Sequence, residues 1–123
     1  MIPQPNDLVS KWIIGLLNNL FEIEKKIQIN SEHTNLKRNV DRMKEIFADQ
    51  KVFFENPLGE SFSETRTDLE ATITGTSTDD LRVIDVIKPI IRVGDRSFSR
   101  VVQKGIVVVE SRWIQTNERE NNV

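Results

Sequence analysis

A regular spacing of apolar residues near the start of the chain constrains its fold more than any other feature of the sequence. Six aliphatic residues recur there at intervals of four, three, four, three and four: Val9, Ile13, Leu16, Leu20, Ile23 and Ile27. This spacing is typical of a helix that packs against other helices in a coiled coil or bundle. Prolines at positions 3 and 5 precede Asp7, so we expect a helix from residue 7 to about residue 30.

The apolar surface of this helix is too wide for a single neighbouring helix to cover. A second apolar stripe lies beside the first and comprises Trp12, Ile14, Leu17 and Phe21. A second helix is expected over residues 33–50, with one apolar face formed by Leu36, Val40, Met43, Ile46 and Phe47. One two-helix hairpin cannot bury both stripes, which favours burial among several helices.

The second half of the chain has the pattern of β-strands. The period changes after Gln50, and strand candidates follow at residues 51–55, 69–74, 82–91 and 105–111. Helices that precede strands predict an α+β fold. We expect a helical module over residues 1–50, a small all-β domain over residues 51–114 and a flexible polar tail over residues 115–123.

Composition restricts the classes of partner. The chain carries 17 Lys and Arg against 19 Asp and Glu, a net charge of −2, so it lacks the basic excess that binds phosphate backbones, and we expect no nucleic-acid partner. It has no Cys and one His, which excludes disulfides, thiolate nucleophiles and His clusters. The longest apolar run, residues 12–17, is far shorter than the ~20 residues of a membrane-spanning helix. Residues 1–7 lack the basic start of a signal peptide, so we expect a cytoplasmic protein with no membrane contact.

Residues that carry catalysis are few. The sequence has no Gly-rich phosphate loop, Ser-His-Asp order or His-containing metal spacing. A small hydrolase would have to use Asp79, Asp80 and Asp85 with a hard cation, but residues 78–80 fall between two strand candidates, where Asp favours turns. His33, near the start of the second helix, is interpreted as a capping or solvated residue. We expect no enzymatic activity, no cofactor and no metal site.

The clearest candidate for an interaction site lies within residues 83–96. An apolar strand passes there into the tight turn Gly94-Asp95-Arg96, where Gly94 can adopt the positive φ that such a turn requires. Arg96 is either an ordinary exposed residue of a β-hairpin or, because a short turn fixes it, an anchor for a protein partner. The sequence pattern alone favours the first interpretation.

The helical part of the chain resembles the GrpE family, the nucleotide exchange factors of DnaK-type chaperone ATPases. Residues 13–20 are similar to the first bundle helix of the family, with Asn18 at a position where the family usually has Asp. Residues 36–58 are similar to the second bundle helix and the first strand.

The same resemblance extends through the β-half. Pro57-Leu58-Gly59 followed by Phe62 matches the turn before the family's His-Glu-Ala signature, which Thr67-Asp68-Leu69 replaces here. Residues 83–96 keep the family's Gly-Asp-Arg turn, with Ile90-Ile91 in place of a Gly-Tyr pair. Four moderate matches in the right order carry the resemblance.

The resemblance implies a homodimer held by a four-helix bundle, with two helices and one small β-domain from each chain. Pairing two hairpins would bury both stripes of the first helix. The residues expected at this dimer interface are Val9, Ile13, Leu16, Leu20, Ile23, Ile27, Leu36, Val40 and Met43. Six residues precede the first helix, so we expect a short form without the family's long stalk helix and with weaker dimerisation.

The resemblance also implies a function that needs no chemistry from this protein. The β-domain would bind the open form of the nucleotide cleft of a DnaK-type ATPase domain more tightly than the closed, ADP-loaded form, and so promote ADP release. The expected partner contacts are Ile87, Gly94, Asp95, Arg96, Val107 and Val109. The alternative is a GrpE-shaped adaptor or assembly module with a different protein partner.

Overall fold

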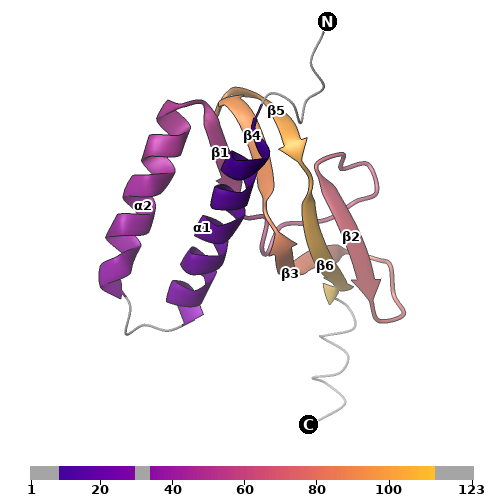
Figure 1. Ribbon diagram of the computed structural model, residues 1–123. Coiled ribbons are helices and arrows are strands. Elements are labelled where there is room, and N and C mark those ends of the chain that lie inside the picture. Colours follow the sequence, from indigo (N-terminus) through magenta and orange to yellow (C-terminus); the bar gives the residue numbers. More distant parts are fainter. Residues whose placement is uncertain (1–8, 30–33, 113–123) are drawn as a thin grey trace, which may run out of the picture. The chain divides into compact units, whose positions relative to one another are not determined.

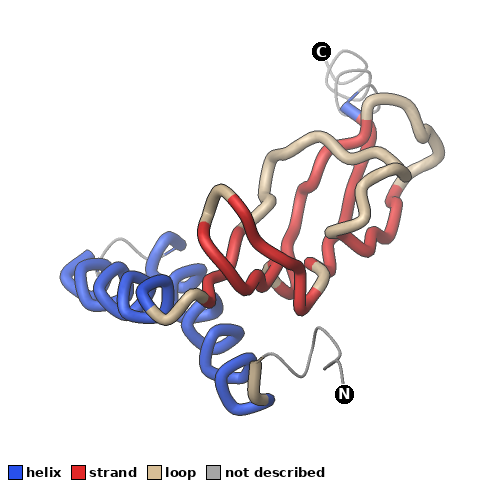
Figure 2. The backbone as a smooth tube through the Cα atoms, turned by 90° about the horizontal axis from the view of Figure 1, so that it is seen from above, coloured by secondary structure: helices blue, strands red, loops and turns tan. Residues whose placement is uncertain are grey.

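The protein, for which we have a computed structural model, is described over residues 9–29 and 34–112 (Figure 1). Within these residues, two helices precede six strands, which confirms the expected α+β class (Figure 2). The helices are α1 (Lys11–Ile29) and α2 (Thr34–Asp49), and the strands are β1 (Val52–Glu55), β2 (Leu69–Thr74), β3 (Leu81–Lys88), β4 (Ile90–Asp95), β5 (Phe98–Gln103) and β6 (Gly105–Ser111). Asp7, His33 and the expected polar tail lie outside the described residues.

The chain forms two compact units, and each is described by itself. The first unit contains the described residues up to Glu55 together with Ile91–Gln103, and the second contains Asn56–Ile90 and the described residues from Lys104 onward. The expected division after Gln50 into a helical and an all-β part differs from this arrangement, because β1, β5 and most of β4 belong to the same unit as the helices.

One face of α1 packs against the strands of its own unit. The Phe21 and Phe54 rings meet edge to face, with centroids 5.9 Å apart and an interplanar angle of 81°. The Asn18 and Gln103 amides exchange two hydrogen bonds of 3.1 and 2.9 Å, which join α1 to β5. Part of the wide apolar surface of α1 is therefore buried within a single chain.

The helix α2 lies beside α1 and is amphipathic (Figure 1). Val40 is buried on its apolar face. Lys44 Nζ lies 2.8 Å from Glu24 Oε2 of α1 and 5.1 Å from the centre of the Phe54 ring. This lysine therefore ties both helices to β1.

The sheet of the first unit has the strand order β1-β4-β5. Strands β4 and β5 form an antiparallel hairpin. The sequence suggested one strand over residues 82–91, but β3 ends at Lys88 and β4 begins at Ile90. The break falls at Pro89, which has no backbone N–H to contribute to a sheet.

The sheet of the second unit has the order β2-β6-β3, in which β6 is parallel to β2 and antiparallel to β3. Alternate residues of β6 are buried, as expected for a central strand with one face on a core. Arg66 braces the loop before β2, because its guanidinium pairs with Asp68 at 3.0 and 2.9 Å and with Glu60 at 3.1 Å. The hydrogen bonds to Asp68, foremost, raise the pKa of Arg66.

In the part of the chain that the structure covers, neither helix combines the length and the apolarity needed to cross a lipid bilayer.

Candidate protein-interaction site

The turn between β4 and β5 brings the predicted Gly94-Asp95-Arg96 motif to the surface of the first unit. Asp95 pairs with Phe98 across the hairpin, so only Arg96 and Ser97 connect the two strands. Short hairpin loops hold their flanking residues in a defined geometry. The turn is therefore a well-fixed projection from the sheet.

Gly94 has the positive φ that the sequence predicted, at 127°. A Cβ at this position would lie 2.5 Å from the Phe98 carbonyl oxygen and 3.0 Å from the Ser99 Cα. The Gly94 N–H also donates a hydrogen bond of 2.8 Å to the Lys51 carbonyl oxygen, just before β1. Gly94 is thus required for the shape of the turn and is not positioned as a side-chain contact.

Asp95 is exposed and pairs with Lys51, whose Nζ lies 2.5 Å from Asp95 Oδ1. The hydrogen bond to Asp95, foremost, raises the pKa of Lys51. Asp95 therefore fastens one side of the turn to the segment that leads into β1.

Arg96 is exposed, and its guanidinium carbon lies 5.0 Å above the centre of the Phe53 ring. A cation over an aromatic ring at an exposed site contributes about 0.5–1 kcal/mol. This contact limits the positions that the guanidinium visits, so a partner that binds Arg96 has less side-chain freedom to remove.

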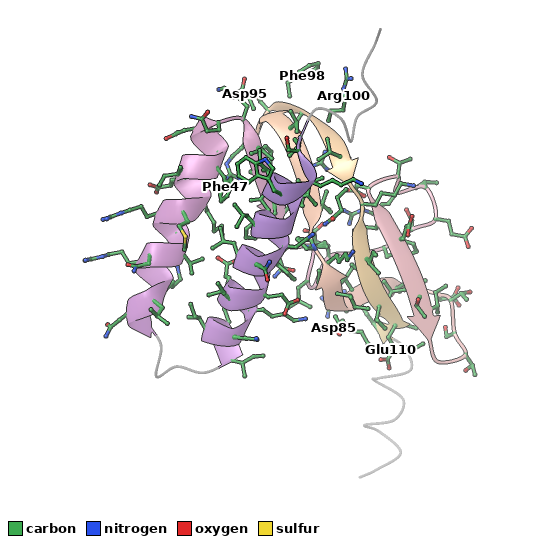
Figure 3. All side chains as sticks on the ribbon, in the orientation of Figure 1. Phe47, Asp85, Asp95, Phe98, Arg100 and Glu110 are labelled. Carbon is green, nitrogen blue, oxygen red and sulfur yellow. The ribbon has the colours of Figure 1, made fainter. Side chains whose placement is uncertain are left out.

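Phe98 is a site residue that the sequence reasoning missed. Its side chain is 87 % exposed and extends from the ribbon at the end of the hairpin (Figure 3). Arg100 is exposed two residues further along β5, on the same face of the strand as Phe98. The signal for Phe98 is a single aromatic residue within the otherwise polar run Asp95 to Arg100. An exposed aromatic ring on the same strand face as an exposed arginine is the composition of a protein-binding anchor.

The three apolar partner contacts expected from the resemblance all belong to the second unit. Ile87 of β3 is 51 % exposed and is available to a partner. Val107 and Val109 are fully buried in the central strand β6. The expectation that these two valines contact a partner is wrong, because β6 uses them for its own core.

The acidic residues considered for catalysis occupy structural positions in the second unit. The Asp79 N–H donates to Ser77 Oγ at 3.2 Å, and Asp80, with φ at 50°, turns the chain into β3. Asp85 Oδ1 accepts a hydrogen bond of 2.9 Å from the Val86 N–H (Figure 3). Within residues 9–29 and 34–112, no group of three or more His, Cys, Asp or Glu side chains is arranged to hold a metal ion.

Of the residues expected at the dimer interface, Ile13 is half-buried, and the others fall into two sets. Four of them are buried within the chain and are corrected from interface to core: Val9, Leu20, Ile27 and Val40. Four remain accessible to a second chain: Leu16, Ile23, Leu36 and Met43. The difference arises because α1 packs one face on its own sheet, which the sequence spacing did not reveal.

Two further apolar residues of the helices, Trp12 and Ile46, are also exposed. Together with half-buried Ile13 they line a hollow of about 340 Å³, which reaches Val52 of β1 and Val93 of β4. Trp12 of α1 and Ile46 of α2 therefore line the same hollow.

Comparison of this chain with protein-family models, with curated proteins and with solved structures finds no match.

Proposed function

We propose that this protein is a GrpE-like nucleotide exchange factor, which binds the ATPase domain of a DnaK-type chaperone and promotes release of ADP. The observation that carries the proposal is the projecting β4–β5 turn, which has exposed Arg96 in its loop and exposed Phe98 and Arg100 on one face of β5. The family resemblance, which covers most of the chain, supplies the partner class, and the turn supplies a place for contact within the motif that the chain retains most fully.

The chemistry of the turn indicates the surface that it would bind. A phenyl ring needs an apolar pocket, and the two guanidinium groups need carboxylates or carbonyl oxygens at the rim of that pocket. Because Asp95 is paired with Lys51, the positive charges of Arg96 and Arg100 dominate the tip of the turn. We expect the partner site to be an apolar pocket with an acidic rim.

Exchange then follows from binding alone. A factor that prefers the open nucleotide cleft shifts the chaperone towards the open form, from which ADP dissociates. To change a 1:99 open-to-closed ratio into 99:1 requires about 5.5 kcal/mol of differential affinity. A few buried anchors of about 2 kcal/mol each supply this amount.

We propose further that the protein acts as a homodimer through its helices. This proposal is supported by six of the exposed apolar residues of α1 and α2, namely Trp12, Leu16, Ile23, Leu36, Met43 and Ile46. Such a concentration of exposed apolar side chains marks an interaction surface.

The test is the release of a fluorescent ADP analogue from a DnaK-type ATPase domain after addition of excess unlabelled nucleotide. We expect the protein to accelerate release, and we expect Phe98→Ser and Arg96→Ala each to reduce the acceleration about tenfold or more. Arg38→Ala, which removes an exposed arginine from α2, is the control and should act like the unaltered protein.

No acceleration at saturating protein would rule out exchange activity on that chaperone. Binding to the ATPase domain without any effect on release would favour the adaptor alternative. Full acceleration by both turn variants would show that the contact lies elsewhere on the molecule.

A further inference from the structure

Each helix exposes a seam of apolar residues that is interrupted once, near its middle, by an asparagine. In α1 the exposed residues follow a four-three-four spacing and comprise Trp12, Leu16, Asn19 and Ile23. In α2 they follow a three-four-three spacing and comprise Leu36, Asn39, Met43 and Ile46. These are the spacings of residues that face a neighbouring helix.

The seams present enough apolar surface for a stable interface. The six apolar side chains have exposed fractions between 40 % and 66 %. At roughly 100 Å² each, they offer on the order of 600 Å², which is the upper limit of the largest apolar patch on a typical monomer and most of the ~800 Å² that each partner buries in a standard interface.

The charges beside the seams suit a second copy of the same chain. Glu22 and Lys26 lie one turn beyond Asn19 and Ile23, and Arg42 and Asp49 lie one turn beyond Asn39 and Ile46. Each helix therefore borders its seam with one acid and one base. Because the acidic and basic residues beside each seam are equal in number, two copies of the chain can approach each other without net electrostatic repulsion.

The two asparagines also restrict what kind of partner can cover the helical seams. A lipid or a purely apolar peptide on these seams would bury the amides of Asn19 and Asn39 without partners, at a cost of about 1–3 kcal/mol each. Asn19 uses one amide hydrogen on the Gly15 carbonyl oxygen at 2.9 Å. A second copy brings further amides to the same surface, and an amide both donates and accepts, so asparagine can pair with asparagine.

We infer that Asn19 and Asn39 form the polar positions of a helical interface between two copies of this chain, where they fix the alignment of the helices at the expense of affinity. The inference rests on the proposed homodimer and adds the residues that determine its geometry. One asparagine in an otherwise apolar helical seam selects a single register and oligomeric state, because misaligned arrangements leave its amide unpaired.

Sedimentation velocity and equilibrium on the full chain test the inference, with Asn19→Leu, Asn39→Leu and the double variant. We expect each single change to lower the dimer dissociation constant about tenfold or more, since it removes a desolvated amide. We also expect species larger than a dimer in the double variant. Gln28→Leu, an exposed amide of α1 outside the seam, is the matched control and should leave the dissociation constant unchanged.

The inference would be overturned if Asn19→Leu and Asn39→Leu both gave the same dissociation constant and the same distribution of species as the Gln28→Leu control. A monomeric wild-type protein that stays monomeric in the double variant would overturn it as well. The ADP-release assay on the same samples separates this result from the proposed function. If the protein accelerates ADP release but the asparagine variants leave the dimer dissociation constant unchanged, only the inference is contradicted. If the variants form tighter dimers but the protein does not accelerate ADP release, only the exchange activity is contradicted.

Discussion

At the scale of single residues, the β4–β5 turn depends on a glycine that no other residue replaces without strain. Gly94 combines a φ of 127° with a backbone so close that an added Cβ would meet the Phe98 carbonyl oxygen at 2.5 Å. Both features oppose a side chain at this position, because a backbone that tolerated the positive φ would still bring the added Cβ too close to the Phe98 oxygen.

We predict that Gly94→Ala lowers the free energy of unfolding by about 1–3 kcal/mol, the range for a residue held in a disfavoured backbone region. Gly15→Ala is the control, because its Cβ would meet nothing within 4 Å on α1, and it should stabilise the protein by about 0.5–1 kcal/mol. Urea denaturation followed by circular dichroism measures both values. Equal stabilisation by the two alanines would contradict the described turn.

Part of the β4–β5 turn site was predictable from the sequence. The Gly-Asp-Arg motif and the positive φ of Gly94 were predictable, because a tight turn needs glycine at such a position. Phe98 was not, because an aromatic residue that follows a turn is in most cases part of a strand's buried face. Its exposure depends on which face of β5 packs inward, and this is a property of the folded unit.

At the scale of secondary-structure elements, α1 divides its apolar surface between two tasks. Leu20 is only 4 % exposed and belongs to the core of the first unit, whereas Leu16, one turn earlier, is half exposed. Both leucines fit the same four-three spacing in the sequence. The spacing predicts the helix and its apolar side correctly, but it cannot tell a face that meets its own sheet from a face that meets another chain.

This division predicts different outcomes for the same substitution at the two leucines. Leu20→Asp buries an unpaired carboxylate, so we expect a loss of several kcal/mol in unfolding free energy and a largely unfolded chain. Leu16→Asp should remain folded and should instead weaken self-association. Circular dichroism combined with sedimentation velocity distinguishes the two. A stably folded Leu20→Asp variant, or a Leu16→Asp variant that dimerises normally, would contradict the assignment of the two faces.

The strands show the same limit of sequence reasoning. The strand character of residues 51–55, 69–74, 82–91 and 105–111 was predictable from their period, but β5 (Phe98–Gln103) was not predicted, and neither was the parallel pairing of β2 with β6. Burial of Val107 and Val109 follows from that pairing, because β6 lies between two strands. Both valines are therefore core residues even though the same sequence pattern fits an exposed hairpin.

At the scale of the whole molecule, our account is that the protein works by binding, with a rigid turn directed at a partner and a helical surface directed at a second copy. No step of the proposed exchange requires this protein to make or break a covalent bond. On this proposal, any effect of the protein on nucleotide release derives entirely from a difference in affinity between two forms of the chaperone. Such a difference is reciprocal, so nucleotide must in turn weaken the complex.

The most direct test of this claim is the affinity for a DnaK-type ATPase domain measured by calorimetry without nucleotide, with ADP and with ATP. We predict tight binding to the nucleotide-free domain, weaker binding in the presence of ADP, and dissociation of the complex on addition of ATP. Equal affinity under all three conditions, or no binding under any of them, would contradict the account.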